Sequence, residues 1–185
     1  MTNKAPPYWM RQTLADLIRH EGIREFAYPD PLSVLATKHR KEKWGFVPAS
    51  VILAKLGEKP SRGAPWTVGV GFTRGVTYET RMSREMAIQK LEQEVIEHLW
   101  VLDKMAPNWL QMPDVVKSVL ANMAFNMGGR LMQFKATFKL LNAGDFAAAG
   151  RNLRASAWYK QVGDRAKELI ERLETGSVQR QFIVN

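Results

Sequence analysis

The chain has 185 residues, of which 45% are hydrophobic, so it is long enough to bury the core of one domain. Its 27 lysines and arginines exceed its 18 aspartates and glutamates, and the formal net charge of +9 favours a polyanionic partner or surface. The absence of cysteine excludes disulfides, thiolate metal sites and a cysteine nucleophile. The three histidines are scattered and no run of about eighteen apolar residues occurs, so we expect no metal, no cofactor and no membrane span.

The first predicted helix begins at Thr13, whose hydroxyl is expected to cap the helix together with Asp16, three residues further on. Apolar residues at helical spacing follow, and Gly22 is a natural end because glycine readily adopts the conformation needed after a helix. Glu21 therefore lies in the last turn. Residues 1–10 lack the apolar block of a secretory signal, and we expect none.

A small antiparallel sheet is predicted after this helix. Its strands are expected at three short runs, 26–28, 66–72 and 76–78, of which the second alternates glycines with apolar residues. Between the first two runs lies a segment, 31–65, with seven lysines and arginines but only two acidic residues. Within it, a short helix is predicted over 48–56.

The rest of the chain is predicted to be helical, because apolar residues recur at helical spacing from residue 83 onward. Aspartates that start helices and glycines that end them divide this part into five helices. These run from Ser83 to Leu102, from Asp114 to Gly128, from Phe134 to Leu141, from Asp145 to Arg154 and from Asp164 to Gly176. Helix, sheet and helices in this order predict an α+β protein dominated by α.

Two carboxylates nine residues apart, Glu21 and Asp30, are expected to have different environments. A carboxyl group in the last turn of a helix faces the negative end of the helix dipole, which favours its protonated form. Asp30 follows in a proline-flanked loop, where we expect it to be solvated and ionised. Glycoside hydrolysis commonly needs such a pair, one acid and one ionised carboxylate. Taken alone, however, Glu21 could equally be an ordinary surface glutamate, and Asp30 an ordinary turn residue before Pro31.

Short motifs around and beyond these carboxylates carry a family resemblance. They are HEG at 20–22, YPD at 28–30, TVGVG at 67–71, NMAFNMG at 122–128, FKAT at 134–137 and SAWY at 156–159. In this order and at this spacing they resemble the catalytic module of the phage-type lysozymes (endolysins), glycoside hydrolase family 24. The resemblance covers about residues 13–176, apart from the segment 31–65.

The resemblance implies a lysozyme-like fold, with a small antiparallel sheet lobe and a helical lobe joined by a long helix. We therefore expect a single domain over residues 1–185, in which 13–82 form the N-terminal lobe and 31–65 are an insert in that lobe. Residues 83–176 would form the helical lobe, and residues 177–185 a tail. We also expect the protein to be a monomer.

The resemblance further implies a peptidoglycan hydrolase that cleaves the β-1,4 bond between N-acetylmuramic acid and N-acetylglucosamine, by a single displacement with inversion. Glu21 would be the general acid, Asp30 would assist the attacking water or stabilise the cationic sugar, and Thr67 would hold that water. Arg165 would pair with Glu21 and orient it. Three further residues would line the saccharide cleft, namely Phe125, Thr137 and Asn152.

Three other functions stay open at this point. A non-catalytic glycan-binding or structural virion module would keep only the sugar cleft, and a lytic transglycosylase would cleave the same bond without water. Nucleic-acid binding rests on net charge alone, because no recognised reader motif or zinc spacing is present, and we do not expect it. For a lysozyme, we expect peptidoglycan and the anionic cell envelope as partners. Its location would be the host cytoplasm before release to the cell wall, with virion association as the alternative.

The chain departs from the family pattern in two places. The family links its aspartate to its threonine by only a few residues, whereas residues 31–66 intervene here. This insert is expected to cover the cleft, to form a basic surface for an anionic envelope, or to dock another protein. Phe72 stands where the family often has a histidine after Gly-x-Gly, a position outside its catalytic set.

Overall fold

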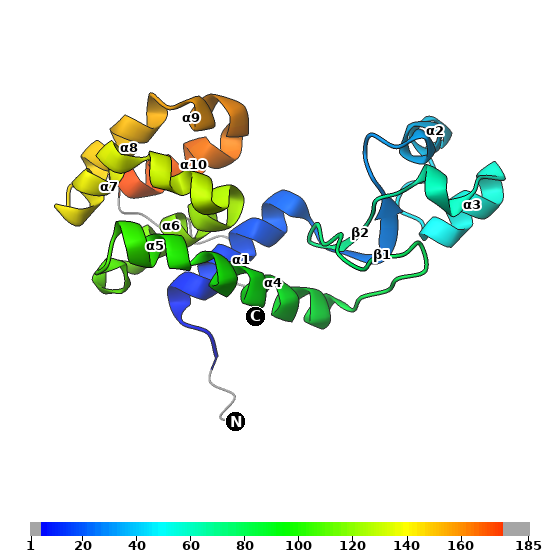
Figure 1. Ribbon diagram of the computed structural model, residues 1–185, viewed down its shortest axis with the longest axis horizontal. Helices are drawn as coiled ribbons and strands as arrows, with labels where there is room; N and C mark the ends of the chain where they lie inside the picture. The colour runs from blue at the N-terminus through cyan, green and yellow to red at the C-terminus, as the bar shows by residue number, and fades with distance from the viewer. Residues whose placement is uncertain (1–4, 176–185) are drawn as a thin grey trace. The chain divides into compact units, whose positions relative to one another are not determined.

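The computed structural model describes residues 5–175, which form two compact units (Figure 1). Among the described residues, the helical unit comprises 5–20 and 92–175, and the sheet unit comprises Glu21–Leu91. The predicted α+β class is confirmed, because the described residues form mostly helices and one two-stranded antiparallel sheet. The predicted tail, 177–185, lies outside the described residues, and the predicted single domain stays a prediction.

The first helix, α1 (Tyr8–Glu21), begins earlier than the sequence predicted, because the carbonyl of Pro7 accepts the first hydrogen bonds of the helix. The predicted cap at Thr13 was wrong. Thr13 lies buried inside the helix, where its hydroxyl donates to the Trp9 carbonyl at 2.8 Å. The predicted end is confirmed, because α1 ends at Glu21 and Gly22 follows with a φ of +74°.

The sheet unit is built on two antiparallel strands, β1 (Arg24–Pro29) and β2 (Trp66–Gly69), which lie side by side in Figure 1. Tyr28 of β1 lies opposite Thr67 of β2. All four residues of β2 are buried, whereas the first residues of β1 are exposed or half-buried. The sheet therefore has one well-packed strand and one strand that is partly open to solvent.

The strand predicted at 76–78 was wrong. Backbone groups in this region are used in local turns, in which the Val76 N–H donates to the Thr73 carbonyl and the Thr80 N–H to the Thr77 carbonyl. The chain does pair with β1 a few residues later, where Arg81 forms an isolated antiparallel bridge with Phe26.

The insert folds as two short helices, α2 (Val34–Glu42) and α3 (Ala49–Leu56), followed by the 3-10 turn η1 (Pro60–Arg62). Helix α3 confirms the helix predicted there. The sequence did not predict α2, which buries only Leu35 and Ala36 and so has almost no apolar stripe. The insert shares one core with the two strands, formed by Ala27, Leu35, Ala49, Ile52, Leu53 and Trp66.

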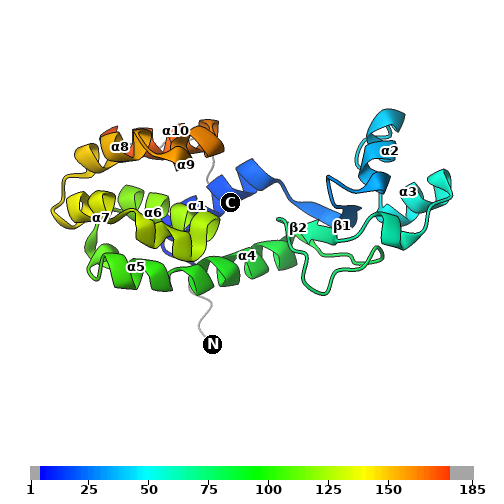
Figure 2. The same cartoon turned by 45° about the horizontal axis from the view of Figure 1, so that its top comes forward.

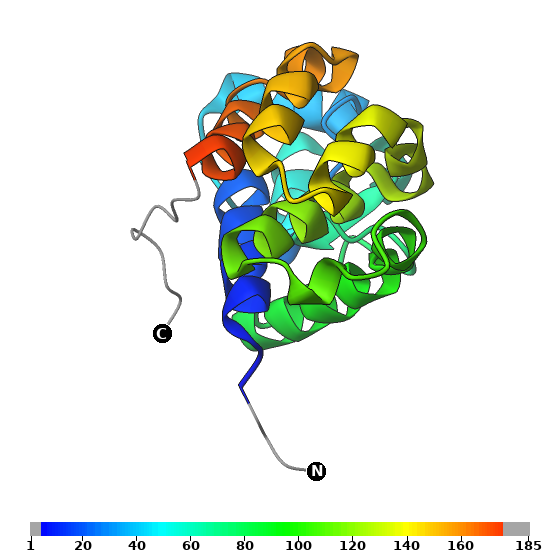
Figure 3. The same cartoon turned by 90° about the vertical axis from the view of Figure 1, so that its left-hand side faces the viewer.

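The helical unit is assembled around α6, in which ten of the fourteen residues are buried. Its helices are α4 (Arg84–His98, which starts in the sheet unit), α5 (Trp100–Met105), α6 (Asp114–Met127), α7 (Lys135–Asn142), α8 (Phe146–Arg154), α9 (Ala157–Val162) and α10 (Asp164–Thr175). Two 3-10 turns, η2 (Trp109–Gln111) and η3 (Gly128–Gln133), connect them. Figure 2 shows α8, α9 and α10 grouped together, and Figure 3 shows α10 beside α1. Within residues 5–175, no helix has the length and apolar character needed to cross a membrane.

The aspartates predicted to cap helices had different outcomes. The Asp145 cap is confirmed, because its carboxylate accepts the N–H of Ala148 at 2.9 Å in the first turn of α8. Helix α6 does begin at Asp114, but the cap predicted there was wrong. Pro113 occupies the cap position, and the Asp114 carboxylate pairs instead with Lys117 at 2.7 Å.

The long helix predicted from Ser83 to Leu102 is two helices, α4 and α5. The N–H of Leu99 donates to the carbonyl of Ile96, and the N–H of Leu102 donates to Leu99, so a tighter turn separates them. The short helix α9 was not predicted. It begins after Ser156, whose hydroxyl accepts the N–H of Tyr159 at 3.2 Å.

Candidate active site

Glu21 is the last residue of α1, and its side chain is exposed. The left-handed conformation of Gly22 ends the helix directly after it and turns the chain into β1. Burial raises the pKa of the Tyr28 hydroxyl, the Arg24 guanidinium lowers it in part, and the Glu21 carboxylate adds to the increase. The net pKa of Tyr28 lies above its ordinary value. Glu21 is therefore electrostatically close to the β1 side chains.

Asp30 directly follows the last residue of β1, where the insert begins. It also contacts the end of the insert, where the chain returns to the sheet. Its N–H donates to the carbonyls of Gly63 and Pro65, at 3.0 and 3.1 Å, on the returning side of the insert. One carboxylate oxygen accepts the N–H of Leu32 at 2.7 Å, which closes an Asx turn at the departing side. Because both ends of the insert meet at Asp30, the long insertion leaves the pairing of β1 with β2 intact.

Thr67 is buried in β2, opposite Tyr28. The sheet unit therefore contains all three residues predicted to be catalytic, with Glu21 before β1, Asp30 after it and Thr67 on the neighbouring strand. Among the residues that the structure describes, no cluster of three histidine or acidic side chains is arranged to hold a metal ion.

Arg165 lies in the helical unit, in the first turn of α10, and its side chain is almost fully buried. Its Nε and Nη2 groups donate to the amide oxygen of Asn122 at 3.0 and 2.8 Å. Asn122 is completely buried on α6. A buried amide thus fixes the plane of the guanidinium, and the remaining N–H groups have a defined direction.

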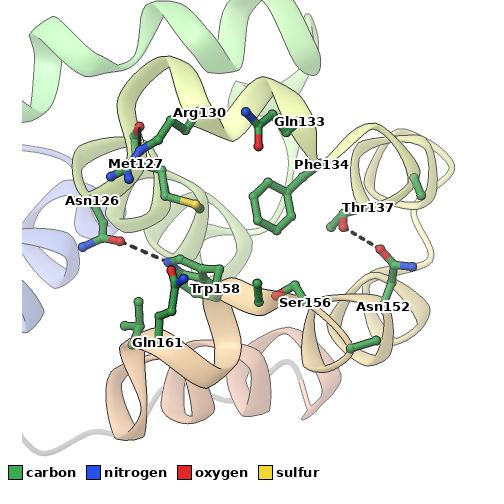
Figure 4. Close-up of a pocket in the computed structure, with 14 residues that line it drawn as sticks. Asn126, Met127, Arg130, Gln133, Phe134, Thr137, Asn152, Ser156, Trp158 and Gln161 are labelled. Carbon is green, nitrogen blue, oxygen red and sulfur yellow. Dashed lines mark hydrogen bonds between the residues drawn. The ribbon is translucent and has the colours of Figure 1, made fainter.

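A cavity of about 790 Å³ lies in the helical unit and is lined by residues of α6, η3, α7, α8 and α9 (Figure 4). Two of the predicted cleft residues meet in its wall, where the Thr137 hydroxyl donates to the Asn152 amide oxygen at 2.7 Å. Phe125 is not among the lining residues, and its ring lies 5.7 Å from that of His98. The helical unit therefore brings Thr137 and Asn152 together in the wall of one cavity that Phe125 does not line.

Asn126 and Trp158 also line this cavity, and the sequence did not assign them to it. The indole Nε1–H of Trp158 donates to the Asn126 amide oxygen at 3.0 Å, as Figure 4 shows. Trp158 is otherwise buried, so its ring packs in the core while one side faces the cavity. The contact joins α6 to α9, and no periodic pattern within either helix predicts such a pairing.

Comparison with protein families extends the resemblance that the motifs indicated. The family model described as phage lysozyme matches residues 55–175, which is more than half of the chain. The chain belongs to the phage lysozyme family. The family match includes Thr67, Arg165 and the three residues predicted to line the saccharide cleft, whereas Glu21 and Asp30 precede its first residue.

Three relatives have names that agree with the phage lysozyme family. The peptidoglycan hydrolase gp36 of Pseudomonas phage phiKMV is 44% identical over 55 residues, which are 29% of this chain and 6% of that protein. The probable T4-type lysozyme 1 of Dictyostelium discoideum is 30% identical over 66 residues, covering 35% and 39% of the two chains. The probable T4-type lysozyme 2 of the same organism is 36% identical over 63 residues, covering 34% and 37%. The chain thus matches less than half the length of each relative.

Proposed function

We propose that this member of the phage lysozyme family hydrolyses peptidoglycan at the β-1,4 bond between N-acetylmuramic acid and N-acetylglucosamine. One observation on this member of the family is the main support for the proposal. Two carboxylates, Glu21 and Asp30, bracket strand β1, and Thr67 lies on the strand paired with it. The names of the three relatives, which are peptidoglycan hydrolase and T4-type lysozyme, support the same activity.

In the proposed reaction, Glu21 donates a proton to the glycosidic oxygen as the bond from that oxygen to the anomeric carbon breaks. Thr67 holds a water molecule, since a hydroxyl both donates and accepts. This water attacks the anomeric carbon, and Asp30 accepts its proton or stabilises the positive charge that develops on the sugar. Attack opposite the leaving oxygen inverts the anomeric configuration.

Substrate binding is proposed to use the cavity of the helical unit. Its wall offers a polar pair, Thr137 and Asn152, beside the aromatic ring of Trp158, which is the mixture of groups that binds small polar ligands. Arg165 is proposed to orient Glu21, and its guanidinium is held for this purpose by the buried amide of Asn122. Phe125 is proposed to contribute to saccharide binding at a place outside this cavity.

The proposal is tested by mass spectrometry of purified peptidoglycan digested with the wild type, Glu21→Gln and Glu42→Gln. We expect muropeptides with a reducing N-acetylmuramic acid from the wild type and Glu42→Gln, and a loss of rate of at least about 100-fold for Glu21→Gln. Glu42 is an exposed glutamate at the end of α2, so its variant is a control with the same change in charge. Equal activity of the two variants would contradict the assignment of Glu21.

The same digest separates the competing functions. Products that end in a 1,6-anhydro sugar would identify a lytic transglycosylase. Binding to peptidoglycan without cleavage by the wild type would identify a non-catalytic glycan-binding or structural module.

One relative is a phage protein, and we infer that this chain acts on the cell wall after release from the host cytoplasm, with virion association as the alternative. Detection of the protein in purified particles would decide for the virion. We also propose that it acts as a monomer, for which gel filtration with light scattering is the test.

A further inference from the structure

Arg24 is held between two aromatic rings in the sheet unit. Its guanidinium carbon lies 4.2 Å from the centroid of the Tyr28 ring on the same strand and 4.2 Å from that of Phe46. Phe46 belongs to the insert, in the loop between α2 and α3. Two aromatic rings at this distance restrict the movement of the guanidinium, while a ring contact does not use its N–H donors. We call Arg24, Tyr28 and Phe46 the arginine clamp.

The guanidinium of the arginine clamp has no carboxylate partner among residues 5–175. Arg19, Arg154 and Arg172, by contrast, each contact at least one carboxylate. Arg24 is half-buried, so part of the residue is accessible to solvent. The arginine clamp therefore offers N–H donors and a full positive charge to an anion from outside.

Phe46 is 82% exposed, which is an unfavourable position for a large apolar ring. Its contact with Arg24 gives it a defined position over the guanidinium. An exposed ring held over a cation leaves its outer face available for a ligand that has both apolar and anionic groups. The insert thus supplies one of the two rings of the arginine clamp, which a chain without residues 31–65 would lack.

The arginine clamp is attached to the same strands as the candidate active site. Arg24 lies opposite Gly69 and Tyr28 opposite Thr67 in the pairing of β1 with β2. The Glu21 carboxylate and the Arg24 guanidinium both influence the pKa of the Tyr28 hydroxyl. An anion bound at Arg24 would therefore belong to a substrate whose glycan reaches the predicted catalytic residues.

We propose that the arginine clamp binds a free carboxylate of the stem peptides carried by peptidoglycan. The inference rests on the proposed function for its choice of substrate. A carboxylate matches the planar guanidinium edge in two parallel hydrogen bonds, which a lysine does not reproduce. The stem peptide also offers aliphatic side chains to the outer face of Phe46. The insert accordingly adds recognition of the peptide to a site that cleaves the glycan.

The test measures binding of the wild-type sequence, Arg24→Gln and Arg81→Gln, each in a Glu21→Gln background, to purified sacculi. Sacculi of a Gram-negative bacterium are used because they carry no phosphate-rich wall polymer. One sample is intact, and in the other the free carboxylates are converted to methylamides. Arg81→Gln is the matched control, because Arg81 stacks on Phe26 of the same strand at 4.6 Å and its loss removes the same charge.

We expect Arg24→Gln to bind intact sacculi on the order of tenfold more weakly than the background protein. Arg81→Gln should change this binding little. On the methylamide sacculi, the background protein and Arg24→Gln should bind equally. The inference is overturned if Arg24→Gln binds intact sacculi normally, if its defect persists on the methylamide sacculi, or if Arg81→Gln shows the same loss.

Two further variants guard against misfolding of Arg24→Gln. Arg24→Lys keeps the charge and Phe46→Ala keeps the guanidinium, and we expect each to give part of the loss while the unfolding temperature stays near that of the wild type. Full binding by both variants would overturn the role of the arginine clamp. Failure of the proposed function is a separate result, because the wild type would then cleave no glycan while carboxylate-dependent binding persists.

Discussion

The two units of the molecule place their cations against different partners. In the helical unit, arginines meet carboxylates, as in the pairs Arg19–Glu168, Arg154–Glu174 and Arg172–Asp16. In the sheet unit, two cations pair with Glu58, but four others stack on rings, in the contacts Arg24–Tyr28, Arg24–Phe46, Lys55–Trp44, Arg81–Phe26 and Lys90–Phe72. An ion pair consumes the donors of a cation, whereas a ring covers its face and leaves its edge free. We expect the first arrangement to contribute to stability, and we propose that the second keeps cations available to a ligand.

The buried charge network of the helical unit connects α1 to α10. Arg172 donates to both oxygens of Asp16 and also contacts Glu168, which in turn accepts Arg19 at 2.5 Å. Asp16 and Arg172 have side chains only 3% exposed. Asp16 therefore does not cap the first helix, as the sequence predicted, but anchors that helix to the last one.

The largest effect is expected in the apolar core of the sheet unit. Trp66→Ala should lower the free energy of unfolding by about 4 kcal/mol, because it removes the largest side chain of the core that the insert shares with the strands. Trp66 also fills the space beside Gly63, where an added Cβ would lie only 2.5 Å from the indole. Urea denaturation measures the change. A loss below about 1 kcal/mol would mean that this core does not hold the insert to the sheet.

A somewhat smaller effect is expected from the charge network of the helical unit. Asp16→Asn should cost about 3 kcal/mol of unfolding free energy, because it leaves the buried Arg172 with only Glu168 as a charged partner. Asp114→Asn is the control, since the pair of Asp114 with Lys117 lies at the surface and should contribute under about 1 kcal/mol. Equal losses in the two variants would show that burial does not set the strength of these pairs.

The acid dependence of stability should also come from the helical unit. Burial raises the pKa of Glu168, but its contacts with Arg19 and Arg172 outweigh this and lower the pKa below its ordinary value. Its contribution is therefore complete above a pH of about 4.3 and is lost as the pH falls further. Burial and the charges of Arg19 and Arg165 lower the pKa of His20, so its contribution is lost as the pH falls below about 6.5.

Thermal unfolding of the wild type and His20→Gln between pH 7.5 and pH 5 tests this dependence. The wild type should lose stability on acidification in this window, and His20→Gln should lose less, because glutamine does not titrate. Parallel curves for the two proteins would show that His20 is not the titrating group. The test compares how steeply the unfolding temperature of each protein changes with pH. The unfolding temperatures themselves are less informative, since the substitution also changes packing at a half-buried position.

Local signals in the sequence predicted many element boundaries. Glycines at 22, 57 and 128 follow the ends of α1, α3 and α6, because each adopts a positive φ that other residues avoid. The Asp145 cap was equally visible, since it needs only a carboxylate three residues before a free N–H. Such features depend on neighbouring residues alone, and one sequence is enough to find them.

Features that join distant residues could not be predicted in this way. The buried partner of Asp16 is Arg172, which is 156 residues away, and Arg165 is held by Asn122 on another helix. The contact of Arg24 with Phe46 depends on how the insert folds back onto β1. For the candidate site, the resemblance identified the residue types, whereas the meeting of both insert ends at Asp30 required the structure.

The smallest effect is expected from a cation that is stacked on a ring. Lys55→Gln should lower the free energy of unfolding by only about 0.5 kcal/mol, because the exposed Lys55 ammonium lies 4.6 Å from the Trp44 ring and contacts no carboxylate in the described part of the chain. The loss should be the same at pH 7 and pH 5, since an indole ring carries no titratable charge in this range. Urea denaturation at both values measures it. A large loss of unfolding free energy, or a loss that disappears in acid, would mean that Lys55 acts through a carboxylate. Lys55 would then resemble the paired arginines of the helical unit and would contradict the difference between the two units.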